Sequence, residues 1–166
     1  EHNKRSRLPS LLATLREKDV ALVSDAGTPG LSDPGAELVS AAAEAGVTVV
    51  PIPGPSAVTS AIAVSGLPGD DFVYLGFLPR KRGERRALLE SASTERRTLV
   101  AFETPHRLLR ALADVLETLG DRRITVCREL TKLHEEVFRG TVSEALAYFA
   151  EPKGEFTLVI EGVVEA

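Results

Sequence analysis

Residues 98–120 read TLVAFETPHRLLRALADVLETLG and contain one complete strand–helix unit. The mainly apolar run 98–102 is typical of a buried strand. Thr104 and Pro105 predict a helix start, because a cap hydroxyl and a proline in the first turn both suit a helix N-terminus. Leucines and a valine then recur at helical spacing as far as Gly120, which suits the residue after a helix. The stretch therefore predicts a strand followed by an amphipathic helix.

The same alternation continues on both sides of this unit. Toward the C-terminus, the pattern at Thr141–Glu144 predicts a further helix start, because these Thr and Glu side chains can each bond the other's backbone N–H. The other elements that we expect are strands at 20–24, 47–52, 72–76, 124–127, 137–139 and 156–161, and helices at 8–18, 34–45, 55–65 and 84–93.

The first half of the chain indicates the fold class. Residues 20–24 and 47–52 are continuous apolar runs separated by a helix that we expect to begin at Asp33–Pro34. Such runs are typical of parallel strands covered on both faces. The pattern breaks at 66–71, where we place a domain boundary. We therefore expect an α/β protein with two α/β domains, at 1–69 and 70–166.

Composition excludes several classes of protein. The chain has 166 residues, 43% apolar and 27% charged, which is enough apolar surface for a folded core. Lys and Arg number 20 and Asp and Glu 24, so the net charge of −4 excludes a generally basic coat. The single cysteine, Cys127, is expected in the core and excludes a disulfide framework or a cysteine-cluster metal site. No apolar run approaches the roughly 18 residues that cross a bilayer. These points favour a cytoplasmic protein with no metal and no membrane contact.

The chain contains no methionine and begins with Glu1. An initiator methionine is usually removed only before a small residue, and glutamate is not small. We therefore expect this chain to be part of a longer protein.

Two loops rich in glycine and proline are candidate binding sites. DAGTPGLSDPG (25–35) leaves one predicted strand and enters a helix, and PGPSA (53–57) does the same after the next strand. At such places in an α/β sheet, backbone N–H groups and a helix N-terminus face a crevice where ligands bind. The alternative is a tight connection without a ligand. The spacing does not match a P-loop or a dinucleotide-binding motif.

Charged residues gather at three further places. RKRGERR (80–86) has five positive charges and one negative charge in seven residues, so it is either a solvated face or a phosphate-binding segment. Glu103, His106 and Arg107 follow one predicted strand, and RELTKLHEE (128–136) follows another. Each of these two clusters can hold a general base or a polar clamp, and the alternative for each is a surface ion-pair network.

Six motifs occur in an order that resembles a known family. DAGTPGLSDPG, PGPSA, GFLPRK, FETPHRL, RELTK and GEFTLVIEG together look like the C-terminal part of the bacterial small-subunit ribosomal RNA methyltransferase I family, in the tetrapyrrole-methylase superfamily. The resemblance covers nearly the whole chain. Porphyrin-modifying members usually carry an acidic GDP-type loop where this chain has residues 27–29, Gly-Thr-Pro, which favours the RNA branch. The resemblance implies a tetrapyrrole-methylase-like fold whose first domain is incomplete in this chain.

The resemblance also implies a function. It implies an S-adenosylmethionine-dependent 2′-O-methyltransferase that acts on the ribose of a cytidine in the decoding region of 16S rRNA, in the small ribosomal subunit, as a homodimer. A glycine-rich loop that the family carries near its start is absent here, so we expect an incomplete cofactor pocket and an inactive chain when it is alone. The alternatives are a precorrin or uroporphyrinogen C-methyltransferase and a non-catalytic RNA-binding module.

Individual roles follow from the same resemblance. Methyl transfer from a sulfonium requires the ribose hydroxyl to be aligned and to lose its proton. The candidates to take that proton, which we leave unranked, are Glu103, His106, Glu129 and Lys132. The expected cofactor contacts are Thr28, Pro29, Leu31, Ser56, Ala57, Glu103, Leu130, Thr157 and Leu158. The expected RNA phosphate contacts are Arg80, Lys81, Arg82, Arg85, Arg86 and Arg107.

Overall fold

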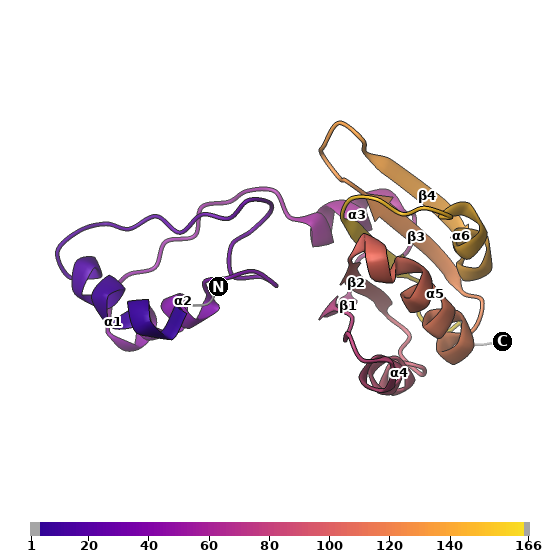
Figure 1. Cartoon of the computed structure of the whole chain (residues 1–166), viewed down its shortest axis with the longest axis horizontal. Helices are drawn as coiled ribbons and strands as arrows, with labels where there is room; N and C mark the ends of the chain where they lie inside the picture. The colour runs from indigo at the N-terminus through magenta and orange to yellow at the C-terminus, as the bar shows by residue number, and fades with distance from the viewer. Residues whose placement is uncertain (1–3, 165–166) are drawn as a thin grey trace. The chain divides into compact units, whose positions relative to one another are not determined.

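A computed structural model describes residues 4–164 of the chain (Figure 1). Contacts divide the chain into two compact units, residues 1–56 and 57–166. The helices of the first unit are α1 (Lys4–Leu15) and α2 (Ala36–Glu44), and all other elements belong to the second unit. The domain boundary at residues 66–71 stays a prediction.

The second unit is built on a five-stranded sheet in the order β1-β2-β5-β3-β4. Strands β1 and β2 are parallel, and every other neighbouring pair is antiparallel. The loop 129–135 is too short to hold a crossover helix, so β3 and β4 pair as a hairpin. The strands are β1 (Phe72–Phe77), β2 (Thr98–Glu103), β3 (Arg123–Arg128), β4 (Glu136–Thr141) and β5 (Phe156–Ile160).

Helices cover both faces of this sheet. On one face lie α4 (Arg82–Ser91), α5 (Pro105–Leu119) and α6 (Val142–Tyr148), with Leu112 and Leu158 fully buried in the core beneath them (Figure 1). On the other face lies α3 (Ala57–Ser65), which packs against an apolar cluster that contains Cys127. Helix α5 supplies more core residues than any other helix because its apolar side chains share one side.

Several helix ends are where the sequence predicts them. Thr141 Oγ1 accepts the backbone N–H of Glu144 at 3.4 Å, and Glu144 Oε2 accepts that of Thr141 at 2.8 Å, so the predicted capping box is confirmed. Helix α5 begins at Pro105 as predicted and ends before Gly120. The hydroxyl of Thr104 does not cap this helix, because it accepts the Arg107 Nε–H at 3.2 Å instead.

The two strands predicted in the first unit are wrong for this structure. Residues 20–24 and 47–52 are irregular, and Val23, Val50 and Ile52 are exposed at 81%, 69% and 84%. A strand forms only where its backbone N–H and C=O groups pair with a neighbour. Neither segment has such a neighbour among residues 4–56, so apolar composition alone does not produce a sheet there.

Helix α2 begins later than predicted. Its N-cap is Gly35, whose φ of 133° lies outside the helical region. Asp33 and Pro34 therefore remain in the preceding turn and do not start the helix. Helix α1 begins at Lys4, earlier than the predicted residue 8.

Candidate functional site

The candidate site is the edge of the sheet where β2 and β3 end and β5 begins. Glu103 of β2 lies opposite Phe156 of β5, and Phe156 lies opposite Arg128 of β3. Because neighbouring strands are about 4.8 Å apart, the backbones of Glu103 and Arg128 are about 10 Å apart. The topology thus brings the two titratable clusters, which follow different strands, to one edge.

Glu103 is buried and forms an ion pair with Arg107. Its side chain is closed to solvent, its Oε1 accepts the backbone N–H of Thr104 at 2.7 Å, and Arg107 Nη2 lies 2.6 Å from the same oxygen. Arg107 Nη1 also donates to the Leu78 carbonyl at 3.1 Å, so one guanidinium joins the ends of β1 and β2 to α5. Burial raises the pKa of Glu103, against the opposing effects of the Thr104 N–H and Arg107. Glu103 Oε2 is buried and has no hydrogen-bond partner in the described chain.

Glu129, Lys132 and Glu155 form a closed group at the same edge. Lys132 Nζ lies 3.1 Å from Glu129 Oε1 and 2.8 Å from Glu155 Oε2. Glu129 Oε1 also accepts the Glu155 N–H at 2.9 Å, and this bond together with Lys132 lowers the pKa of Glu129. Glu155, with Glu129, raises the pKa of Lys132. A carboxylate with a lowered pKa and a protonated amine accept protons poorly, so this group is suited to holding the loop.

The loop that follows β3 has an unusual backbone. Glu129 and Thr131 have φ angles of 49° and 67°, which residues with a Cβ rarely adopt. Leu130 between them is half-buried and packs on the apolar cluster beneath α3. The group around Lys132 therefore stabilises a turn that directs Leu130 back toward the sheet.

Of the four candidate proton acceptors, His106 is the one whose side chain is both exposed and unbonded within the described residues. It is exposed in the first turn of α5, and nothing in residues 4–164 bonds its ring. Glu103 is closed to solvent, while Glu129 and Lys132 bind each other. The structure thus distinguishes candidates that the sequence leaves equal.

The predicted cofactor contacts of the first unit lie on its two loops. Thr28 Oγ1 donates to the Pro55 carbonyl at 3.1 Å, so the loops 25–35 and 53–57 meet. Pro29 lies beside Thr28 in the first loop, and Leu31 is exposed a little further on. Ser56 belongs to the second loop.

The predicted cofactor contacts of the second unit divide between the two faces of the sheet. Thr157 lies between Phe102 and Cys127 in register, on the face where Leu130 packs and where Ala57 begins α3. Leu158 points to the opposite face and is fully buried beneath α5. Its side chain is therefore closed to solvent, and its expected contact with the cofactor stays a prediction.

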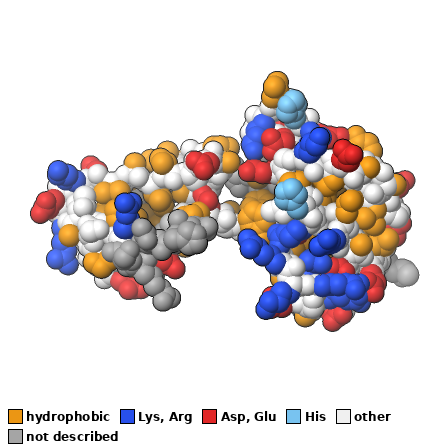
Figure 2. All heavy atoms as spheres, in the orientation of Figure 1, with side chains coloured by type: hydrophobic (Ala, Val, Ile, Leu, Met, Phe, Trp, Pro, Cys, Tyr) orange, Lys and Arg blue, Asp and Glu red, His pale blue; other side chains and the backbone are white. Residues whose placement is uncertain are grey.

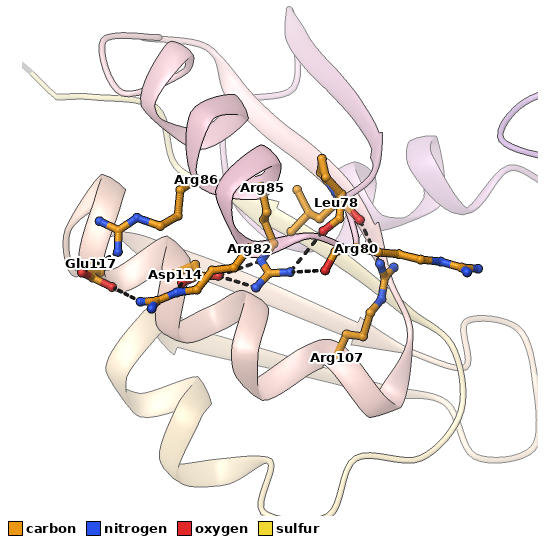
Figure 3. A network of polar contacts seen from close by, with 9 residues as sticks. Leu78, Arg80, Arg82, Arg85, Arg86, Arg107, Asp114 and Glu117 are labelled. Carbon is orange, nitrogen blue, oxygen red and sulfur yellow. Dashed lines mark hydrogen bonds and ion pairs between the residues drawn. The ribbon is translucent and has the colours of Figure 1, made fainter.

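The basic stretch 80–86 is not a uniform solvated face. Arg85 is 4% exposed, and its Nη2 lies 2.5 Å from Asp114 Oδ2. Its Nη1 donates to the carbonyls of Pro79 at 3.1 Å and Arg80 at 3.3 Å. Arg82 Nε donates to the other oxygen of Asp114 at 3.0 Å (Figure 3). The arginines of α4 therefore fasten this helix to α5.

The remaining cations of the stretch point outward. Figure 2 shows Lys and Arg side chains gathered near Asp and Glu side chains over this part of the second unit. Arg80 extends away from the network in Figure 3, and its guanidinium has no bonding partner in the part of the chain that the structure describes. Among the expected RNA contacts, Arg85 and Arg107 are bonded inward, and Arg80, Lys81 and Arg86 point outward. Arg82 does both, because its Nε binds Asp114 while its side chain is 65% exposed. Which of these residues contact RNA stays a prediction.

Asp114 is a buried partner of the α4 arginines that the sequence analysis missed. It is 3% exposed and lies among the buried residues of α5. A carboxylate on the apolar side of a helix is almost never buried without a cationic partner. An aspartate on the apolar side of a predicted helix, downstream of an arginine-rich segment, could therefore have indicated the buried ion pair between Asp114 and Arg85.

A cavity lies away from the candidate site. A cavity of about 330 Å³ at the opposite end of the sheet, lined by residues such as Ser65, Thr125 and Arg139, contains none of the predicted site residues. Residues 4–164 contain no group of three or more His, Cys, Asp or Glu placed to hold a metal ion. Within the same range, no helix is both long and apolar enough to cross a membrane.

Comparison with known proteins identifies the family. The family model described as Tetrapyrrole (Corrin/Porphyrin) Methylases matches residues 1–146. The chain is 53% identical over 166 residues to Ribosomal RNA small subunit methyltransferase I of Synechocystis sp., covering 98% of this chain and 60% of that protein. It is 52% identical to the protein of the same name from Thermotoga maritima, covering 98% and 74%. The chain belongs to the ribosomal RNA small subunit methyltransferase I family of tetrapyrrole methylases.

Solved structures of other tetrapyrrole methylases share the fold. The methyltransferase CobJ aligns with a TM-score of 0.70 at 20% identity, covering 95% of this chain and 71% of that chain. A uroporphyrin-III C-methyl transferase from Thermus thermophilus, complexed with S-adenyl homocysteine, aligns with a TM-score of 0.63 at 18% identity, covering 96% and 73%. The expected α/β tetrapyrrole-methylase-like fold is confirmed. The chain spans 60% and 57% of the lengths of its family relatives from Synechocystis and Halalkalibacterium halodurans.

Proposed function

We propose that the protein transfers a methyl group from S-adenosylmethionine to the ribose 2′-hydroxyl of a cytidine in the decoding region of 16S rRNA. The observation that carries this proposal is the 52–53% identity with relatives named Ribosomal RNA small subunit methyltransferase I. The nucleotide and the 2′-oxygen come from the motif resemblance, as do the homodimer and the cytoplasmic location. The solved tetrapyrrole-modifying relatives are far more distant, at 18–20% identity, so we favour the RNA substrate.

The residues present suit an S-adenosyl group. Leu130 offers a half-buried apolar side chain on the face of the sheet that also contains Thr157, which is 5% exposed, and Ala57 is a small residue at the start of α3. In the first unit, the bond from Thr28 to Pro55 holds together two loops with exposed backbone. We assign the cofactor contacts to these residues and leave out the Leu158 side chain, because it is buried in the opposite face. When bound, S-adenosylmethionine supplies a methyl group on a sulfonium.

The outward cations suit the RNA backbone. Arg80, Lys81, Arg82 and Arg86 lie on or beside the first turns of α4 with side chains reaching solvent. Guanidinium groups match phosphate oxygens well and position a nucleic acid without reading its bases. In this proposal Arg85 and Arg107 keep the elements in place and do not touch the RNA.

His106 is the residue that we assign to the substrate hydroxyl. Its ring is exposed beside Arg107, at the strand-end edge where the chain's titratable groups meet. Its ring has no partner in residues 4–164, whereas Lys132 is bonded to two carboxylates that raise its pKa and keep it protonated. Glu103, Glu129 and Lys132 are positioning residues in this assignment.

The test is methylation by the full-length protein. Small ribosomal subunits from cells that lack the gene are incubated with S-adenosylmethionine, and 2′-O-methylation is mapped along the rRNA by mass spectrometry. We expect one new 2′-O-methylcytidine in the decoding region. We expect His106→Ala to lower kcat by about 100-fold or more while subunit binding is retained.

Three results would contradict the proposal in different ways. Methylation of uroporphyrinogen but not of rRNA would favour the tetrapyrrole alternative. Binding to the subunit with no heat of S-adenosylmethionine binding would indicate a non-catalytic RNA-binding module. Methylation at full rate by His106→Ala would leave the substrate assignment standing and reject the role of His106.

A further inference from the structure

Two arginines of α4 hold one carboxylate of α5 between them. Arg82 Nη2 lies 2.9 Å from Glu117 Oε2, and Arg86 Nη1 lies 2.6 Å from Glu117 Oε1 (Figure 3). Residues 82 and 86 are one helical turn apart, so their side chains leave the same side of α4. The Glu117 side chain is 51% exposed and that of Arg82 is 65% exposed, so this arrangement lies at the surface.

One arginine of the pair is held from beneath. Arg82 Nε is bonded to Asp114 Oδ1 at 3.0 Å, and the buried contact between Arg85 and Asp114 fixes α4 against α5. The Arg82 guanidinium therefore keeps a fixed position when Glu117 is displaced, which lowers the entropy cost of binding, while Arg86 is bonded within residues 4–164 to Glu117 alone. Arg80, exposed at the start of the same segment, adds a cation without a competing carboxylate.

The grouping matches phosphate chemistry. Two guanidinium groups that each hold one oxygen of an anion can do the same for two oxygens of a phosphodiester. Hydrogen bonding and charge from Arg86, with Arg82, lower the pKa of Glu117, so this carboxylate is ionised at neutral pH and occupies the pair as an anion. Exposed ion pairs are weak, so a polyanion can displace the carboxylate.

We propose that Arg82 and Arg86 form a phosphate-binding pair for the RNA backbone and that Glu117 is its resident competitor, which RNA displaces. This inference rests on the proposed function. It adds that the Glu117 carboxylate lowers the affinity of this surface for RNA. Glu117 weakens the binding of any RNA whose phosphates do not displace its carboxylate from the two arginines. Its removal therefore strengthens RNA binding.

The test uses the full-length protein and a transcript of the 16S rRNA decoding region, with binding measured over a series of KCl concentrations. Glu117→Gln keeps the shape of the side chain and removes its charge. We expect affinity to rise about threefold to tenfold at low salt. We also expect the log–log salt dependence to steepen by about 0.7 to 1.4, because each additional phosphate contact contributes about 0.7 in single strands.

Two matched variants separate this effect from net charge. Glu95→Gln removes a carboxylate that is paired with Arg97 at 2.6 Å, beyond the end of α4 that is opposite Arg82, and changes the net charge equally. We expect it to change affinity less than twofold. In a chain with Arg82→Ala and Arg86→Ala, affinity should fall and Glu117→Gln should have no further effect. Circular dichroism confirms that each variant is folded.

The outcomes distinguish this inference from the function on which it rests. Wild-type protein that binds the transcript, together with equal effects of Glu117→Gln and Glu95→Gln, would overturn the competitor role and leave the proposed function intact. A gain from Glu117→Gln that persists without Arg82 and Arg86 would overturn it too. Wild-type protein that binds no rRNA at any salt concentration would contradict the proposed function itself.

Discussion

Arg85 on α4 and Asp114 on α5 are bound to each other beneath the surface of the second unit. Both side chains are 4% exposed, and Arg85 Nε and Nη2 both donate to Asp114 Oδ2, at 2.8 and 2.5 Å. The most basic segment of the chain therefore supplies a buried fastening between two helices as well as a charged surface. The same carboxylate also accepts the Arg82 Nε–H at 3.0 Å, so it anchors two arginines of α4.

Asp114→Asn should destabilise the second unit strongly. The change leaves the Arg85 guanidinium buried without its counter-charge, and breaking a buried ion pair costs about 3–5 kcal/mol. Urea unfolding measures the free energy. The matched control is Asp70→Asn, at an exposed residue, for which we expect a change within about 0.5 kcal/mol. A loss below about 1 kcal/mol for Asp114→Asn would show that water reaches Arg85.

The stability of Glu103→Gln, relative to wild type, should increase as pH rises. Burial raises the pKa of Glu103, against Thr104 and Arg107, so the folded protein disfavours the ionised carboxylate compared with the unfolded chain. Above the unfolded pKa of about 4.3, wild-type protein therefore loses stability relative to the uncharged variant. The difference in Tm, variant minus wild type, is expected to increase between pH 4 and pH 8.

Asp114→Asn provides a control of opposite sign for this pH dependence. Burial raises the pKa of Asp114, but the hydrogen bonds from Arg82 and Arg85 outweigh it and lower the pKa overall. The carboxylate therefore stabilises the fold above its unfolded pKa, and that stability is lost as pH falls through the folded pKa. The Tm difference for Asp114→Asn should become more negative as pH rises. A difference that rises for Asp114→Asn would contradict the lowered pKa of Asp114, and one that falls for Glu103→Gln would contradict the raised pKa of Glu103.

Gly154→Ala should disturb the turn at the strand-end edge. Gly154 has a φ of 90°, and a Cβ there would lie 2.6 Å from Glu129 Cγ. We expect a loss of about 2 kcal/mol, the sum of backbone strain and displacement of Glu129. Gly120→Ala is the control, because its φ of 84° is similar but no atom lies within 4 Å of the added Cβ. It should lose only about 1 kcal/mol, and equal losses would mean that Glu129 moves aside freely.

Cys127 should react slowly in the folded protein. Burial raises the pKa of its thiol to about 11. Since the thiolate is the reactive form, labelling by a disulfide reagent at pH 8 should be about 100-fold slower than in the denatured chain. Spectrophotometric titration with and without 6 M guanidinium chloride measures both rates. Rapid native labelling would mean that α3 leaves the sheet readily.

Prediction from the sequence succeeded where the decisive information is local. The β2–α5 unit and the capping box at Thr141 are set by residues within one or two helical turns of each other. It failed at 20–24 and 47–52, because a strand needs a partner that local composition does not supply. It also treated residues 80–86 as one charged run, because the carboxylate that binds Arg85 lies 29 residues away.

The sequence by itself determined the α/β class, most elements of the second unit and the resemblance that leads to an rRNA methyltransferase, since periodicity and motif order are properties of the chain. The tertiary structure alone decided the mixed strand order, the meeting of Glu103 and Glu129 at one edge, and the separation of inward from outward arginines. These depend on which distant side chain fills the space beside each group. A buried charge is stable only when the fold places its partner there.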